Sequence, residues 1–315
     1  MERETLKSRL GFILLSAGCA IGIGNVWKFP YIAGQDGGGA FVLFYLIFLV
    51  ILGLPIMTME FAVGRASQKS AARSFHVLEP AGTKWHLQGY ACMAGNYLLM
   101  MFYTTVGGWM AAYIFKTLTG EFKGLDSDGV AAVFNDMLAR PGYMTFWMVL
   151  VVLLSFFICS LGLQKGVERI TKAMMSCLFL ILLILCIRSV TLPGASEGLR
   201  FYLIPDFTRF TENGVGNTIF AAMGQAFFTL SLGIGAMAIF GSYIGKDHTL
   251  TGETINICLL DTLVAFLAGL IIFPSCFAFG VDPGQGPGLV FITLPNIFNQ
   301  MVGGRIFGVL FFVFM

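Results

Sequence analysis

Four side chains that carry oxygen lie inside stretches that are otherwise long and apolar: Asn25, Thr229, Ser231 and Asp261. An acid in the middle of a membrane span costs about 2.5 to 3.5 kcal/mol on insertion scales, so Asp261 predicts a function. Carboxylate, amide, hydroxyl and carbonyl oxygens are the ligands that hard cations take. These residues therefore predict a site for a cation such as sodium. The alternative for Asp261 is a structural acid that is kept neutral or hydrogen-bonded inside the protein.

Residues 18–30, GCAIGIGNVWKFP, place three glycines, an Asn and a Lys where a first membrane helix should be most apolar. An unwound helix frees carbonyls and N–H groups, which are costly in hydrocarbon unless something binds them. The carbonyls suit a cation, and the N-terminus of a half-helix suits a substrate carboxylate. AIGIGN returns as SLGIGA around residue 233. Such an echo predicts inverted repeats with broken helices, in a five-plus-five arrangement; close helix packing is the alternative.

The elements that hold these residues are expected to be membrane helices. The chain has 315 residues, 57% hydrophobic and 11% charged, with a mean hydropathy of +0.82, which excludes an ordinary water-soluble domain. Since a span needs roughly 20 apolar residues, we expect seven spans and the first half of an eighth. They cover 10–34, 41–63, 89–115, 146–161, 173–187, 217–245, 257–280 and 306–315.

These spans predict an all-α integral membrane protein that is truncated at its C-terminus. Residues 1–190 would form the first repeat, with spans 1–5. Residues 191–315 would hold an outer loop, spans 6 and 7, a re-entrant or capping loop at 281–304 and the start of span 8. The Lys and Arg residues of the short loops place the N-terminus in the cytoplasm, as in a multi-pass protein of the inner or plasma membrane. The polar loop after the second span is expected to form a short interfacial helix.

Other features of the sequence carry less information. The seven cysteines lie almost entirely in apolar spans and are interpreted as unpaired thiols. His76, His86 and His248 lie in or near cytoplasmic loops without metal-ligand spacing, and no role is assigned to them. The net charge of +2 indicates no particular partner. We expect the lipid bilayer as surroundings and no nucleic acid; the sequence does not indicate an oligomeric state.

Three segments carry a resemblance to a known family: 8–41, SRLGFILLSAGCAIGIGNVWKFPYIAGQDGGGAF; 53–65, GLPIMTMEFAVGR; and 224–236, GQAFFTLSLGIGA. The chain resembles the neurotransmitter:sodium symporter family, which shares the fold of the bacterial leucine transporter, and looks like a bacterial amino-acid member. The resemblance implies an inverted-repeat fold with discontinuous first and sixth helices. It also implies one or two sodium ions as coupled ions.

The resemblance implies two ion sites and a substrate pocket. The first sodium site would use the Ala20 carbonyl, Asn25, Thr229 and Asp261 together with the substrate carboxylate. The second would use the Gly18 and Ile21 carbonyls, its other ligands lying beyond residue 315. The pocket would comprise Cys19, Ala20, Gly22, Ile23, Gly24, Leu99, Tyr103, Phe228, Thr229, Ser231 and Ile234. Gly24 and Tyr103 would bind the carboxylate, and Phe228 would act as a lid. Because amine-carrying relatives have an Asp at the position of Gly22, a glycine favours amino acids.

Gate and anion positions follow from the same resemblance. Arg3 and Lys28 match the inner and outer gate cations, with a snorkelling cation as the alternative for both. Glu60 would bridge backbone N–H groups of the two broken helices in a structural role. The anion site of chloride-dependent relatives maps onto Tyr45, Gln225 and Thr229. Asp261 replaces an Asn there and Ala265 a polar residue, so chloride independence is expected.

The function predicted from the sequence is sodium-coupled symport of neutral hydrophobic amino acids, aliphatic or aromatic, into the cell by alternating access. No organic cofactor is expected. The alternative is a non-transporting amino-acid-binding membrane protein or an inactive truncated fragment. An enzyme is the weakest interpretation, because no nucleophile–base pair or metal cluster is evident in the sequence.

Overall fold

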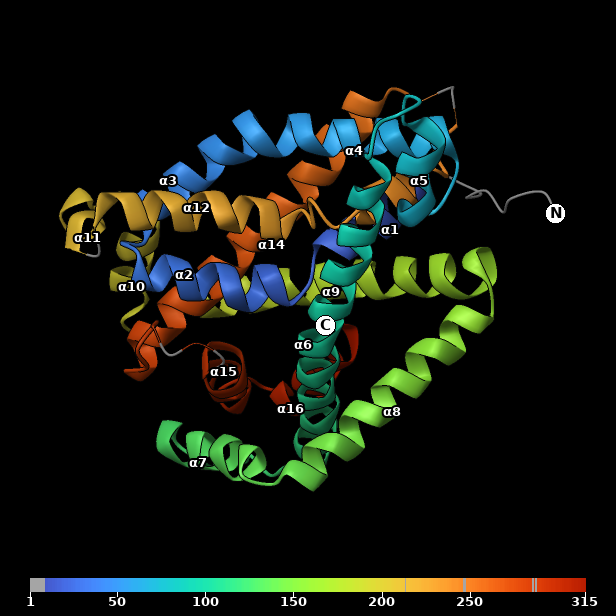
Figure 1. The fold of residues 1–315 in the computed structure, drawn as a ribbon. Coiled ribbons are helices and arrows are strands. Elements are labelled where there is room, and N and C mark those ends of the chain that lie inside the picture. The colour runs from blue at the N-terminus through green and yellow to red at the C-terminus, as the bar shows by residue number, and fades with distance from the viewer. Residues whose placement is uncertain (1–8, 213, 246–247, 285, 287) are drawn as a thin grey trace.

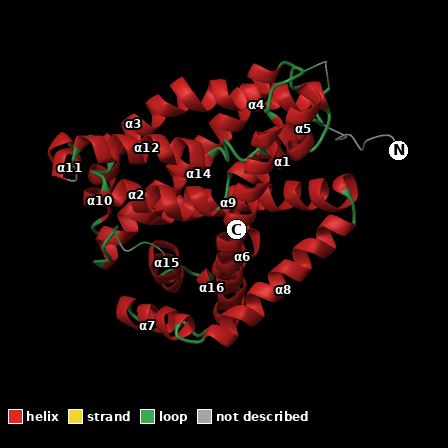
Figure 2. Cartoon of the chain, viewed as in Figure 1, coloured by secondary structure: helices red, strands yellow, loops and turns green. Residues whose placement is uncertain are grey.

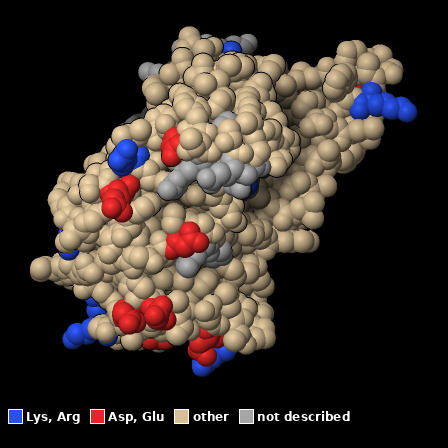
Figure 3. Space-filling model, turned by 90° about the vertical axis from the view of Figure 1, so that its left-hand side faces the viewer, with Lys and Arg blue, Asp and Glu red and all other residues tan. Residues whose placement is uncertain are grey.

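A computed structural model of the chain describes residues 9–212, 214–245, 248–284, 286 and 288–315. Helices joined by short loops make up most of this part of the chain, and no β-strand beyond an isolated bridge occurs in it (Figure 2). An all-α architecture is therefore confirmed. Charged side chains are sparse on the face shown in Figure 3, most of which is uncharged, as expected for a protein that faces lipid.

Of the first two predicted spans, the first is broken and the second is continuous. The first consists of α1 (Arg9–Ala20), a π-helical turn η1 (Gly24–Lys28) and α2 (Phe29–Gln35), with a bend of 49° at the break. The second runs without interruption through α3 (Gly39–Phe48), η2 (Leu49–Gly53) and α4 (Leu54–Ser67). The short helix α5 (Ala71–Leu78) follows, which confirms the helix predicted in the polar loop.

Three further spans follow α5 along the chain. They are α6 (His86–Thr119), α8 (Pro141–Ser160) and η3 with α9 (Leu163–Glu168 and Arg169–Val190), and the short helix α7 (Ser127–Leu138) lies between α6 and α8. Figure 1 shows α6 crossing the direction of α4, α12 and α9. The short helices α10 (Ala195–Leu203) and α11 (Phe207–Glu212) follow α9 and lead into the second part of the chain.

The predicted sixth span is also broken. It consists of α12 (Val215–Thr229) and the six-residue α13 (Ala236–Gly241), separated by residues 230–235. Ser231, Gly233 and Gly235 have φ angles of 52°, 85° and 73° in this gap. The left-handed region that they occupy cannot continue a right-handed helix, and it suits glycine because glycine has no Cβ. After this gap, α13 ends at Gly241, short of the predicted end of the span at residue 245.

The long helix α14 (Leu250–Phe279) is the centre of the packing. It contacts α1, η1, α4, α9 and α10, while α12 packs on α3 and α13 packs on α4. The segment after α14 folds as η4 (Leu289–Thr293) and α15 (Leu294–Asn299), whose side chains are largely buried, so it packs on protein as predicted. The last helix, α16 (Gly304–Phe314), lies against α6, α9 and α15.

Candidate ion and substrate site at the two breaks

The side chain of Asp261 lies at the middle of α14, facing the break in the first span, and it is fully buried. Asn25 Nδ2 donates to Asp261 Oδ1 at 2.8 Å and to the Asp261 carbonyl at 3.1 Å. Thr229 Oγ1 donates to Asp261 Oδ2 at 3.0 Å. The structure thus brings together three of the four oxygen-bearing residues found in the apolar spans, and each carboxylate oxygen has a partner.

The break in the first span is stabilised by side chains from both halves of the chain. Gln225 Nε2 donates to the Gly24 carbonyl at 3.2 Å, and the Gly22 N–H donates to Asn25 Oδ1 at 3.2 Å. The second bond gives the Gly22 N–H a partner at the break, and the first adds a side-chain donor to the Gly24 carbonyl, which also accepts from the Phe29 N–H. Gln225, predicted as an anion-site or structural residue, therefore has a direct structural contact with the first break.

The break in the sixth span is held by α4 and α6. The Gly233 N–H donates to Glu60 Oε1 at 2.6 Å, and Asn96 Nδ2 donates to the Ile234 carbonyl at 2.7 Å. Ser231 Oγ joins the two breaks, since it donates to the Cys19 carbonyl at 3.3 Å. Glu60 was expected to bridge both broken helices. Among the hydrogen bonds of the described residues, its contact is with the sixth-span break, and Ser231 makes the link to the first.

A cavity of about 610 Å³ lies beside these breaks. Five of the predicted pocket residues line it, together with residues of η1, α2, α6 and α12 that the sequence did not single out. The predicted ones are Leu99, Tyr103, Phe228, Ser231 and Ile234, and the others include Ile32, Gly95, Leu98, Phe220 and Phe227. Lys28 and Gln225, which the sequence assigned to a gate and to an anion site, also line the cavity. A volume of this size falls in the range of small-molecule sites.

The remaining predicted pocket residues lie at the break itself. Cys19 and Ala20 end α1, and Gly22 and Ile23 lie in the gap before η1. A Cβ added at Gly22 would meet nothing within 4 Å, whereas one added at Gly24 would lie 3.1 Å from the Phe228 ring. Gly22 therefore leaves free space, and Gly24 lets the aromatic ring approach the backbone.

Lys28 lies at the cavity rather than apart from it. Its ammonium nitrogen is 3.4 Å from the centroid of the Phe228 ring, a cation–π distance. The predicted outer-gate cation is thus in contact with the predicted lid. The predicted inner-gate residue Arg3 lies outside the described residues.

The two residues predicted for a second sodium site lie on α1 and at its end. Ile21 lines a separate cavity of about 240 Å³ between α1, α9 and α14, together with apolar residues such as Leu14, Phe179 and Val264. A Cβ added at Gly18 would lie 2.9 Å from a methyl carbon of Thr171 on α9. For this second sodium site, the ligands predicted within the described part of the chain are the backbone carbonyls of Gly18 and Ile21.

The comparisons with known proteins agree with this arrangement. The model of the "Sodium:neurotransmitter symporter family" matches residues 3–126 and 127–315. The chain belongs to the sodium:neurotransmitter symporter family. The resemblance stated from the motifs is thereby confirmed.

Individual relatives show how much of a whole family member the chain spans. It is 40% identical over 306 residues to the uncharacterized sodium-dependent transporter YhdH of Bacillus subtilis, covering 97% of this chain and 66% of the relative. It is 30% identical to the sodium- and chloride-dependent GABA transporter 2 of Mus musculus, covering 94% of this chain and 56% of the relative. The chain therefore spans about two thirds or less of these relatives, which are transporters and not enzymes.

A solved structure shares the fold. The crystal structure of MhsT in complex with L-phenylalanine matches with a TM-score of 0.93 and 42% identity, covering 99% of this chain and 70% of that protein. The inverted-repeat transporter fold with two broken helices, expected from the sequence, is thus confirmed.

Proposed function

We propose that this protein carries out sodium-coupled uptake of neutral hydrophobic amino acids by alternating access in the cell membrane. The supporting observation is the buried cluster of Asp261, Asn25 and Thr229 at the first break. Its donor set, a carboxylate, an amide and a hydroxyl, is one that a hard monovalent cation takes. One buried negative charge would be neutralised by one sodium ion, with the Ala20 carbonyl as a further ligand at the end of α1.

The substrate class follows from the cavity and from Gly22. The lining of Leu99, Ile234 and Phe228 suits an apolar side chain, and Tyr103 offers a hydroxyl. The free space at Gly22 would take the substrate carboxylate next to the sodium ion, which would couple the two. The phenylalanine bound in the MhsT structure supports an amino acid of this kind.

The proposed division of the chain follows the two breaks. Residues 1–190 would form the first repeat and residues 191–315 part of the second. The breaks near residues 22 and 233 would then be corresponding points of the two repeats, with the substrate between them.

We also propose that chloride is not required. Tyr45, Gln225 and Thr229, which match the positions where chloride-dependent relatives bind the anion, are all buried. Thr229 donates to Asp261 Oδ2, so the carboxylate would supply the negative charge that those relatives take from chloride.

The test is binding of tritiated leucine and tryptophan to the purified protein in sodium or potassium gluconate, with and without chloride. We expect saturable binding that requires sodium and does not require chloride. Gly22→Asp should abolish it, because the new carboxylate would repel that of the substrate, while Gly22→Ala tests whether bulk alone has the same effect. Equal binding in sodium and potassium would refute the proposal. Sodium-dependent binding without uptake in proteoliposomes would favour the non-transporting alternative.

A further inference from the structure

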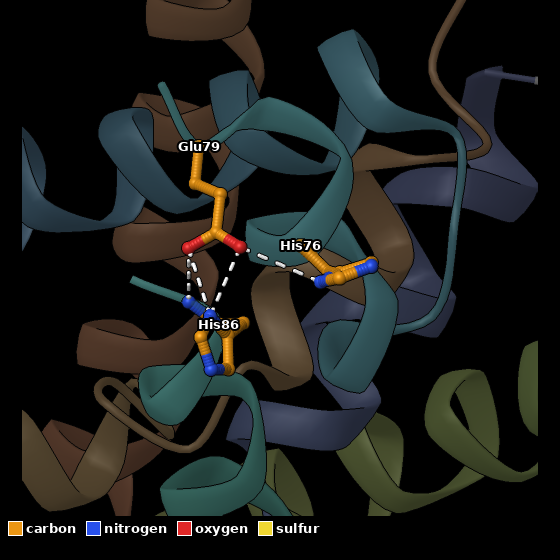
Figure 4. A group of neighbouring side chains, drawn as sticks. All are labelled: His76, Glu79 and His86. Carbon is orange, nitrogen blue, oxygen red and sulfur yellow. Dashed lines mark hydrogen bonds and ion pairs between the residues drawn. The ribbon is translucent and has the colours of Figure 1, made fainter. Parts of the chain in front are cut away.

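The turn between α5 and α6 gathers three side chains that the transport site does not use. His76 lies in the last turn of α5, Glu79 caps this helix, and His86 is the first residue of α6. Figure 4 shows both histidine rings directed at the Glu79 carboxylate. The spacing of these histidines fits no metal motif, so no role could be predicted for them from the sequence. The turn brings them together.

The distances define a compact group. His86 Nδ1 is 2.9 Å from Glu79 Oε1 and 3.0 Å from Oε2, and His76 Nδ1 is 3.4 Å from Oε1. One ligand atom from each residue lies within 4.8 Å of those of the other two. Two imidazole nitrogens therefore converge on a single carboxylate.

We propose that His76, Glu79 and His86 form a binding site for a divalent first-row transition metal ion such as Zn²⁺. Two histidines and one glutamate are a known zinc ligand set that leaves a fourth position open. In a tetrahedral site with bonds of about 2.0 to 2.1 Å, ligand atoms lie about 3.4 Å apart. The His76–Glu79 separation has this value, and His86 needs to withdraw by about 0.5 Å.

The surroundings favour a cation with these ligands. The His86 backbone N–H donates to Glu79 Oε2 at 3.0 Å, which fixes the carboxylate as an outer-shell bond does in metal sites. This bond, followed by the contact with the His86 ring, lowers the pKa of Glu79. The His76 side chain is 72% exposed, which leaves the open position to water.

A metal ion here would link the end of α5 to the start of α6. Both helices pack near the second break: a Cβ added at Gly235 would lie 2.7 Å from Ala71 on α5 and 3.4 Å from Cys92 on α6. Cys92 and Asn96 also bond to the carbonyls of Gly233 and Ile234. The bound ion, on the predicted cytoplasmic side, would therefore restrain α5 and α6, which both pack beside this break.

The test is calorimetric titration of Zn²⁺ into the whole purified chain, after removal of any polyhistidine tag. We expect one saturable site of the order of one ion per chain. Hydrogen exchange should slow in residues 79–86. His76→Ala, Glu79→Gln and His86→Ala should each weaken binding at least tenfold. His248→Ala is the matched control, since it removes a histidine that lies on another turn, near Glu253.

The outcomes are separable from those of the transport proposal, because neither substrate nor sodium is used. His76→Ala is the decisive variant, since a largely exposed side chain can be truncated without disturbing the packing. Zn²⁺ binding that is equal in the protein and in a folded His76→Ala variant would overturn the proposal. So would the absence of saturable Zn²⁺ binding at neutral pH. Mg²⁺ should not compete with Zn²⁺ for this site, because Mg²⁺ takes oxygen ligands.

Discussion

Replacement of Asp261 by Asn tests whether the buried carboxylate is the anionic ligand of the coupled ion. The amide has nearly the shape of the carboxylate. Its oxygen can keep the bond from Asn25, and its nitrogen can donate to Thr229, whose hydroxyl can turn to accept. The packing around residue 261 should therefore survive, while the one formal charge of the cluster is lost.

The size of the effect follows from the loss of that charge. Interactions of a charged group are worth about 1 kcal/mol more than those of a neutral one, which sets the lower limit. Two unit charges about 4 Å apart at an effective dielectric constant of about 20 attract by about 4 kcal/mol, which sets the upper limit. The sodium concentration at half-saturation should thus rise at least about fivefold, and as much as about a thousandfold.

The assay is sodium titration of leucine binding at fixed leucine concentration, with chloride present and absent. Asp136→Asn is the matched control, because Asp136 is an exposed acid that pairs with Arg140 on the surface. A folded Asp261→Asn variant with unchanged half-saturation would refute the role of the carboxylate. Sodium binding that recovers only when chloride is added would support the charge-replacement argument.

Three further predictions concern packing, the cavity and the α5–α6 turn. Gly64→Ala should destabilise the protein by about 1 to 3 kcal/mol, because a Cβ would overlap the backbone of α13. Gly216→Ala, in α12 with open space around it, should not destabilise the protein. Thermal unfolding in detergent measures both variants. Lys28→Met should raise the dissociation constant for tryptophan, because the ammonium would no longer hold Phe228 as a lid. A double-mutant cycle with Phe228→Leu should give a coupling free energy of about 0.5 to 2 kcal/mol. Additive effects of the two substitutions would refute the contact. Because the pKa of Glu79 is lowered, its contribution to stability is present above the ordinary glutamate pKa and is lost as pH falls through the lowered value. Glu79→Gln should therefore be less stable than the unmodified chain at pH 7 and equally stable in acid. A difference in stability that persists unchanged in acid would contradict this.

Much of the membrane architecture could be predicted because it depends on hydropathy. A run of about 20 apolar residues specifies a span whatever packs against it. The polar members of the central cluster were also visible, since Asn25, Thr229 and Asp261 interrupt such runs, and the structure brings all three into contact. Asn96 interrupts an apolar run in the same way and was overlooked, although it bonds to the carbonyl of Ile234.

Other contacts could not be read from the sequence because they depend on tertiary placement. Lys28 lies on Phe228, 200 residues away in the chain, and no local pattern predicts a pair of this kind. The group of His76, Glu79 and His86 depends on a turn whose geometry is not specified by ligand spacing. Polar residues that interrupt apolar runs could thus be predicted to meet, whereas these two contacts could be found only in the structure.

The repeated Gly-Ile-Gly shows how one motif can serve two physical needs. In the sixth span, Gly233 and Gly235 adopt φ angles of 85° and 73°, so alanine would strain the backbone there. In the first span, the φ angles of Gly22 and Gly24 are not in that region, and these glycines instead provide free space and close approach of Phe228. The sequence echo therefore marks equivalent breaks, but only the second is produced by left-handed backbone. Side chains hold both breaks, through Asn25 and Gln225 at the first and Glu60 and Asn96 at the second, but Asn25 also donates to Asp261, so the geometry of the first break should be the more sensitive to ion binding.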